Sequence, residues 1–369
     1  MGLSGAVCGW CCGIVLVCVA VIFLLWNEGR AVRRAYLLDE ALSRCRSLTN
    51  IDVAFDNNNG HLVHLTGTLI TTEPLEDTHY GISVWAVRLR RVVEMYQWVE
   101  EHYTREYEED GETRKEVTYY YSKEWKRTLI DSSFFDESWF HKNPSTFPIG
   151  QKEWKAHTMV GSFQLSAALV ELLTDWWPVE LSFNDRLNSE GVILLDSVIY
   201  YSNNPTIPEV GDVRIKYEAA GHAGSTRPDR VSIIARQSQG AELTAYYSAD
   251  LDEELLLLHT GTASHEEMFS KEHTSNIIMT WVYRGIGWCG TFIGFILFTN
   301  LGMYLVEDIP VIRELVSCGL LITNIILASS VTLFTIAIGW LRHRPLIAIA
   351  LLAIASIPYM MMVKKQIPR

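Results

Sequence analysis

The chain has 369 residues, 49% of them hydrophobic, and carries a formal net charge of −12. The charge is uneven, because residues 27–280 hold 24 Lys and Arg against 40 Asp and Glu, whereas the first 26 residues hold none. So acidic a segment is a poor electrostatic match for nucleic acid, and we expect no nucleic-acid partner. Of the seven cysteines only Cys45 lies in this segment, which excludes a disulfide framework there within one chain.

The N-terminal stretch carries no charge from Leu3 to Trp26, and it is long enough to cross a hydrocarbon core about 30 Å thick as a helix. It has no basic leader and a long apolar run, so residues 1–26 are expected to be a retained anchor rather than a cleaved signal peptide. Small residues at every fourth position let helix backbones approach closely in lipid. The first span has this pattern at Gly5, Gly9 and Gly13.

Three cysteines in this span, Cys8, Cys11 and Cys12, are candidates for S-palmitoylation. The string "CGWC" has the spacing of a thioredoxin-like redox motif. That motif needs a βαβ context, which an uncharged membrane segment does not provide, so we expect no redox chemistry.

The segment between Asn27 and Cys45 has apolar residues at helical spacing, which predicts that the first helix continues out of the membrane. A polar turn follows at "DNNNG". The rest of residues 27–280 is expected to be a large β-rich α+β domain. Ser162–Trp176 reads as an amphipathic helix in it. Strands are predicted at 61–70, 81–87, 192–201, 212–219, 231–236 and 255–259.

A long hairpin is predicted around Asp110-Gly111, because an Asp-Gly pair favours a two-residue turn. Opposite charges and aromatic rings that face each other across such a ladder each contribute about 0.2–1 kcal/mol. We therefore expect a bent, structural hairpin rather than a carboxylate-based catalytic site. The predicted pairs are Glu106 with Lys115, Arg105 with Glu116, Glu94 with Arg127, Tyr96 with Trp125, and His102 with Tyr119.

The C-terminal part contains three more uncharged stretches, Gly285–Val306, Leu321–Leu341 and Pro345–Val363. Ser264 and Glu267 form a capping box that opens the helix leading into the first of them. The predicted fold class is a membrane protein with four transmembrane α-helices and a β-rich α+β extramembrane domain between spans 1 and 2. The later spans are placed at residues 284–306, 315–341 and 345–363, followed by a short basic tail at 364–369.

The later spans carry few polar features. Gly290 and Gly294 form another small-residue pair suited to helix packing. No charged residue lies inside the uncharged stretches, although such residues usually mark transporters and proton paths. The third predicted span has a weak polar stripe of Thr323, Asn324, Ser330 and Thr335. Helix–helix hydrogen bonding is its favoured use, and a wet path in an oligomer is the alternative.

No motif recommends an enzyme. "GIGWCG" at Gly285–Gly290 spells G-x-G-x-x-G, but it sits at a membrane entry rather than after a strand. "HEEMF" at His265–Phe269 lacks the second histidine of the zinc motif H-E-x-x-H. We therefore expect no catalytic residues, no cofactor and no metal.

Eight short strings occur in the order and with the spacing found in one known family, which the chain resembles from about Asn27 to its C-terminus: "NEGRA", "EMYQWVE", "REYEEDG", "HKNPS", "PEVGDVR", "IARQ", "LLLLHTG" and "RPL". This is the LUMA family, also called transmembrane protein 43. The resemblance implies a four-span protein of the endoplasmic reticulum and inner nuclear membrane that oligomerises and organises complexes with emerin and lamins. It also implies links to innate immune signalling and to channels or junctions.

Charge alone does not fix the side of the membrane on which the domain lies. Arginines after the first span and after the third favour a cytosolic domain, whereas Lys364, Lys365 and Arg369 favour the opposite. The resemblance implies a lumenal domain. We predict a non-enzymatic membrane scaffold that contacts lipid and self-associates. An ion channel or channel subunit is the alternative, and an enzyme acting on lipid ranks third.

Overall fold

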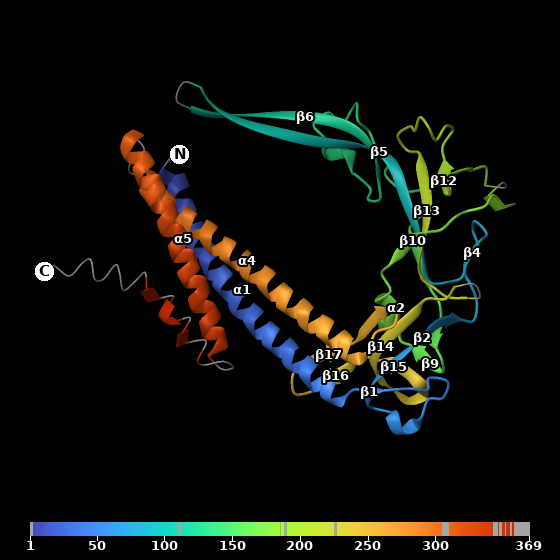
Figure 1. Cartoon of the computed structure of the whole chain (residues 1–369). Coiled ribbons are helices and arrows are strands. Elements are labelled where there is room, and N and C mark those ends of the chain that lie inside the picture. Colours follow the sequence, from blue (N-terminus) through green and yellow to red (C-terminus); the bar gives the residue numbers. More distant parts are fainter. Residues whose placement is uncertain are drawn as a thin grey trace. The chain divides into compact units, whose positions relative to one another are not determined.

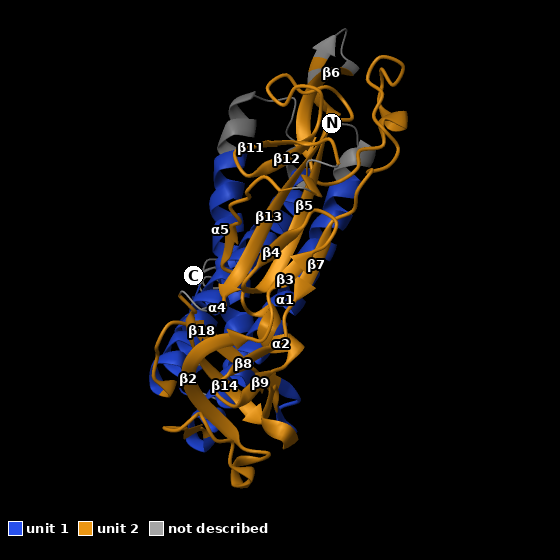
Figure 2. Ribbon diagram, turned by 90° about the vertical axis from the view of Figure 1, so that its right-hand side faces the viewer, with its two compact units in different colours: residues 1–44, 247–253, 266–369 blue, residues 45–246, 254–265 orange. Residues whose placement is uncertain are grey.

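The computed structural model separates the chain into two compact units, drawn in different colours in Figure 2. Unit 1 comprises residues 1–44, 247–253 and 266–369, and unit 2 comprises residues 45–246 and 254–265. The structure describes all residues except 1–2, 110–111, 185, 188–189, 225–226, 305–309, 342–345, 347–348, 351, 355 and 358–369.

Unit 1 is built on three long helices, α1 (Leu3–Arg44), α4 (His265–Tyr304) and α5 (Pro310–Trp340), which lie side by side (Figure 1). Within the described part of the chain these three are long and apolar enough to cross a membrane. At 1.5 Å per residue the 42 residues of α1 span about 63 Å, roughly twice the hydrocarbon thickness. The helix therefore continues beyond the apolar stretch, as predicted.

The predicted fourth span, residues 345–363, lies largely outside the described residues, so it stays a prediction. Its described members, such as Leu346 and Ile349, are helical.

The capping box at Ser264 and Glu267 correctly places the start of α4 at His265. The compact units also group residues 27–44 and 266–280 with the membrane helices, whereas the sequence counted them with the extramembrane domain.

The first sheet of unit 2 closes on itself. Its strand order is β1-β2-β8-β9-β15-β14-β18, and an additional pairing of β2 with β14 joins five of these strands into a ring. The bounds are β1 Arg46–Ser47, β2 Leu62–Thr71, β8 Thr158–Val160, β9 Phe163–Leu165, β14 Arg230–Gln237, β15 Glu242–Thr244 and β18 Leu257–Thr260. Helix α2 (Ala167–Glu171) follows β9, and short η helices lie at Asp56–Asn58 and Gln239–Ala241.

The interior of this ring is apolar. Phe163 is its largest fully buried side chain, and Leu65 and Ile233, which are partners in the β2–β14 register, are also fully buried. Leu169 and Leu173 complete the same core from the segment after β9. Burial of side chains of this size contributes about 1.5–3 kcal/mol each, so the ring has a core of its own.

The predicted helix at Ser162–Trp176 is wrong. The segment instead forms β9, the five-residue helix α2, and then β10 (Trp176–Pro178). The helix prediction placed Phe163, Leu169, Leu173 and Trp176 on its apolar face. The first three are buried, whereas Trp176 is only half-buried. The spacing of the apolar residues suggested a helix for a simple reason. A short strand followed by one helical turn brings the same side chains to one core as a continuous helix would.

The second sheet of unit 2 has the order β11-β12-β13-β5-β6, with β10 added to β13 and β7 to β5. Its core contains the buried rings of Tyr80 and Tyr217. The bounds are β5 Ala86–Glu109, β6 Glu112–Lys126, β7 Lys152–Lys155, β11 Ile193–Leu195, β12 Val198–Tyr201 and β13 Val213–His222. Small ribbons pair β3 (Leu75–Asp77) with β4 (Ile82–Val84) and β16 (Tyr246–Ser248) with β17 (Glu253–Leu255).

The predicted hairpin register is confirmed. The β5–β6 pairs run from Met95 with Lys126 to Glu109 with Glu112 and include all the predicted strand pairs up to Tyr96 with Trp125. Beyond the ladder, Arg127 donates to Glu94 at 3.3 Å. β5 bends between its sheet part and its hairpin part (Figure 1). The predicted turn at Asp110-Gly111 lies outside the described residues.

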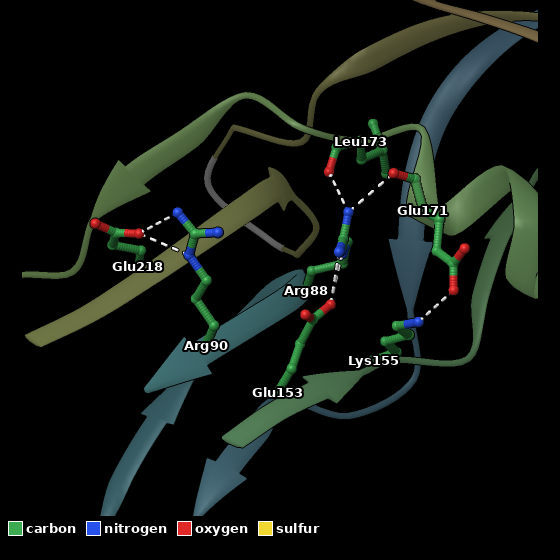
Figure 3. A network of polar contacts seen from close by, with 7 residues as sticks. All are labelled: Arg88, Arg90, Glu153, Lys155, Glu171, Leu173 and Glu218. Carbon is green, nitrogen blue, oxygen red and sulfur yellow. Dashed lines mark hydrogen bonds and ion pairs between the residues drawn. The ribbon is translucent and has the colours of Figure 1, made fainter. Parts of the chain in front are cut away.

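One buried arginine links the two sheets of unit 2 (Figure 3). Arg88 of β5 donates to the Glu153 carboxylate of β7 at 2.7 and 2.9 Å, and to the backbone oxygens of Glu171 and Leu173 at 2.9 Å. Its guanidinium lies 4.7 Å from the Trp176 ring. Because Leu173 belongs to the core of the ring and Arg88 to the second sheet, this side chain fixes one sheet against the other.

Candidate functional site

Facing polar side chains join α1 and α4 in unit 1. Arg30 donates to the Asn276 side chain at 3.2 Å and to the Thr280 hydroxyl at 3.3 Å. Asn27 donates to the Thr280 backbone oxygen at 3.2 Å, and Asn276 donates to the Ala31 backbone oxygen at 2.9 Å. Asn276 and Thr280 are four residues apart and therefore share one face of α4. This face of α4 is therefore held against α1 by specific hydrogen bonds as well as by apolar contact.

The most buried ion pair among the described residues of unit 1 is that of Glu28 and Arg284. Arg284 Nε and Nη2 donate to the two carboxylate oxygens of Glu28, each at 2.7 Å, in a bidentate arrangement. The side chains are 1% and 10% exposed. Trp340 of α5 donates its indole N–H to Glu28 Oε2 at 2.6 Å. Glu28 therefore binds groups from two other helices at once.

Aromatic rings enclose this pair. The Arg284 guanidinium lies 4.8 Å from the Trp281 ring and 5.4 Å from the Trp340 ring. A Cβ on Gly339 would lie 2.8 Å from the Glu28 Cβ, so a glycine is needed where α5 approaches α1. Arginine is suited to this position because its planar guanidinium can pair with a carboxylate and stack on rings together.

The ion pair marks the edge of the apolar part in three helices. Glu28 follows the first uncharged stretch, which ends at Trp26, and Arg284 directly precedes the second. Trp340 is the penultimate residue of the third stretch. Charged side chains are costly inside hydrocarbon, but they are tolerated near helix ends when paired. The site therefore lies where the apolar stretches meet the polar segments that flank them on one side.

A pocket of about 290 Å³ adjoins the pair. Its lining residues come only from α1, α4 and α5: Glu28, Ala31, Val32, Ala35, Asn276, Ile277, Thr280, Trp281, Arg284 and Trp340. Most of the wall is apolar, and its charged groups already bind each other. Among the described residues no cluster of three or more His, Cys, Asp or Glu side chains could hold a metal ion.

The glycines singled out for helix packing lie at the α1–α4 contact within one chain. A Cβ on Gly13 would lie 2.6 Å from the backbone oxygen of Gly294, and a Cβ on Gly290 would lie 3.3 Å from the Ala20 Cβ. Gly9 has more room, with its nearest α4 atom at 3.8 Å. Gly5 belongs to α1, but its surroundings are outside the described side chains.

The predicted polar stripe of the third span divides between two faces. Asn324 is 2% exposed and donates to the Thr299 hydroxyl of α4 at 2.9 Å. Ser330 and Thr335 are also buried, whereas Thr323 is half-buried and donates to the backbone of its own helix. The buried members therefore lie between helices of the same chain.

The three N-terminal cysteines of interest are exposed on α1. Cys8, Cys11 and Cys12 are free thiols, as are the other four cysteines of the chain. Their exposure is compatible with acylation, which stays a prediction.

The sequence reading missed the ion pair. Glu28 was read only as part of a family string, and Arg284 was passed over at the start of a span. The sequence did contain a signal for this pair. Successive spans cross the membrane in opposite directions, so the end of span 1, the start of span 2 and the end of span 3 lie at the same membrane face. An acid, a base and a tryptophan occur at those three places.

The long apolar helices are held together by a buried ion pair, and the β-rich unit lies between α1 and α4 in the chain. These features define a polytopic membrane protein with a structural polar site. The family described as Transmembrane protein 43 matches residues 95–345. Transmembrane protein 43 of Rattus norvegicus is 40% identical over 352 residues, covering 94% of this chain and 87% of that protein. The Homo sapiens protein is 39% identical with the same coverage, and the Drosophila melanogaster homolog is 33% identical over 353 residues, covering 94% of this chain and 92% of that protein.

The chain therefore belongs to the transmembrane protein 43 family, which confirms the family predicted from the short strings. No solved structure matches it.

Proposed function

We propose that the chain is a non-enzymatic membrane scaffold, in which the helices form a rigid anchor and the β-rich unit presents binding surfaces to other proteins. The observation that supports this is the use of the polar side chains in the helices. Glu28 binds Arg284 and Trp340, and Asn324 binds Thr299. Such bonds hold helices in one arrangement, which suits a support on which complexes are assembled.

We place this scaffold in the endoplasmic reticulum and inner nuclear membrane, with the β-rich unit in the lumen and emerin and lamins among the proteins it organises. Family membership supports the location. We also propose that copies self-associate. Because Gly13 and Gly294 already face each other within one chain, self-association would use other faces of the helices.

Proximity labelling tests this proposal. A biotin ligase fused to the full chain should label emerin and other nuclear-envelope proteins more strongly than the same ligase on an unrelated reticulum membrane protein. A neighbourhood without nuclear-envelope and reticulum proteins would reject the scaffold role at these membranes.

The alternative function, an ion channel or channel subunit, requires the polar residues of α5 to line a wet path. Asn324 is instead buried against α4. Planar bilayers with purified protein distinguish the two functions. A scaffold gives no reproducible current, whereas currents that change in Asn324→Leu would favour the channel.

A further inference from the structure

The pocket beside the Glu28–Arg284 pair lies in unit 1, at the point where α5 ends. Trp340, the last residue of α5, binds Glu28, and α1 and α4 continue together past this point (Figure 1). The rest of the wall comes from residues 31–35 of α1 and 276–281 of α4. The pocket therefore occupies a place beside these two helices that the third helix leaves free.

The polar side chains in the wall already have partners. The Thr280 hydroxyl donates to the Asn276 backbone oxygen at 2.6 Å and accepts from Arg30 at 3.3 Å. The Asn276 side chain accepts from Arg30 at 3.2 Å, and Glu28 and Arg284 bind each other. A ligand with polar groups would bury them here without partners, which costs free energy. The wall is therefore suited to hydrocarbon.

The pocket is also larger than a site for one water molecule. Its volume is about 290 Å³. An apolar cavity of about 150 Å³ stays dry and takes up a molecule of the size of benzene. The pocket therefore has room for about twice that volume of hydrocarbon.

The pocket reaches an outer surface of α4 that is itself apolar. Two of its lining side chains, Ile277 and Trp281, are 59% and 64% exposed, and the neighbouring Ile278 and Val282 are 56% and 48% exposed. The buried Arg284 is the only charged residue between positions 274 and 306. An apolar outer surface on a helix that is long and apolar enough to cross a membrane faces lipid. Lipid chains are therefore the molecules that meet the pocket.

We propose that this pocket binds one acyl chain of a membrane phospholipid. An acyl chain brings no polar group to a wall whose polar side chains are already bonded, and its rotatable bonds let it follow the wall. The hydroxyl of a sterol would need a partner that this wall does not offer. The bilayer around the helices supplies acyl chains at high local concentration, so weak binding is enough. The bound chain completes the packing of α1 and α4 beyond the end of α5.

Photolabelling of the full chain in phosphatidylcholine vesicles tests the proposal. The probe is a phosphatidylcholine with a diazirine on one acyl chain, and mass spectrometry locates the label within the tryptic peptide 272–284. This peptide contains Thr280, which lines the pocket and is 6% exposed, and Val282, which lies on the outer surface. A bound chain should label Thr280 as well as Val282. Label on Val282 without label on Thr280 would reveal ordinary bilayer lipid only and would overturn the proposal.

A variant that fills the pocket gives a second readout. Ala35→Phe places a ring in the wall of the pocket and should lower the labelling of Thr280 at least threefold, while the labelling of Val282 stays unchanged. Val282→Phe is the matched control, because it places the same ring on the outer surface, and it should leave the labelling of Thr280 as it was. Unchanged labelling of Thr280 in Ale35→Phe protein with wild-type circular dichroism would contradict the proposal. If this variant does not fold, the comparison of Thr280 with Val282 in the wild type still decides.

Other occupants of the pocket give different results. A sterol probe with a diazirine that labels Thr280 more strongly than the phospholipid probe would assign the pocket to a sterol. Absence of label on Thr280 with both probes would mean that the pocket is empty or is filled by another part of the chain. Either result would overturn the assignment to an acyl chain.

Discussion

Glu28 of α1 and Arg284 of α4 lie 256 positions apart in the sequence, yet two hydrogen bonds of 2.7 Å join their side chains. Trp340 of α5 adds a third bond to the same carboxylate. A charge in this position is costly without a partner, so the pair specifies which faces of three helices meet.

Removing one partner of this pair should destabilise the protein strongly. We expect Glu28→Ala to lower the free energy of unfolding by about 3–5 kcal/mol, because Arg284 would stay buried without its partner. Thermal unfolding of the purified chain in nanodiscs measures the loss. The double variant Glu28→Leu with Arg284→Met should recover much of it, since no unpaired charge remains.

The control for this prediction is Arg33→Gln. Arg33 pairs with Glu253 within the same unit, but its side chain is 49% exposed, so the loss should stay below about 1 kcal/mol. Equal losses in Arg33→Gln and Glu28→Ala would contradict the role given to burial.

The close contact of α1 with α4 makes a second prediction. Gly13→Ala should destabilise the chain by about 1–3 kcal/mol, because its Cβ would lie 2.6 Å from the Gly294 backbone oxygen. Gly319→Ala on α5 is the matched control, since nothing lies within 4 Å of its Cβ. If both variants unfold at the wild-type temperature in nanodiscs, the glycine contact does not hold the helices together.

The second sheet of unit 2 makes a pH prediction at Glu94. Burial raises the pKa of this carboxyl, but hydrogen bonds from Arg214 and Lys216 outweigh burial and lower the pKa below its ordinary value of 4.5. A lowered folded-state pKa stabilises the protein above 4.5, and this contribution is lost as the pH falls through the folded-state value. Glu94→Gln should cost about 1.5–3 kcal/mol at neutral pH.

The measurement is the difference in Tm between wild type and Glu94→Gln as a function of pH. It should be largest near neutral pH and shrink below about 4.5. Glu171→Gln is the control, because the exposed pair of Glu171 with Lys155 should give a smaller difference at every pH. A difference in Tm between wild type and Glu94→Gln that does not change with pH would contradict the lowered pKa of Glu94.

The proposed location of unit 2 in the lumen can be tested with an N-glycosylation site that a proline now blocks. Asn143-Pro-Ser and Asn204-Pro-Thr each lack only a permissive middle residue. Asn143 is hydrogen-bonded to β5, whereas Asn204 is exposed, so Pro205→Ala is the useful variant. We expect an endoglycosidase-sensitive mass increase in cells, which additional Thr206→Ala should abolish. An unmodified Asn204 together with a glycosylated acceptor added to the C-terminal tail would reverse the orientation.

Local chemistry explains what could be predicted. The hairpin register followed from one Asp-Gly pair and from complementary partners such as Tyr96 with Trp125, because turn and ladder involve neighbouring residues. The Ser162–Trp176 helix failed because its apolar spacing suits two structures, and the ring closed by β2 and β14 chooses between them.

By itself the sequence determined three membrane-spanning segments and the family. Uncharged stretches avoid water whatever they contact, and the short strings are read directly from the residues. Tertiary structure alone decided that Glu28 binds Arg284 and that Gly13 faces Gly294. The physical reason is that these relations depend on contacts between distant segments, whose energies no single stretch of sequence contains.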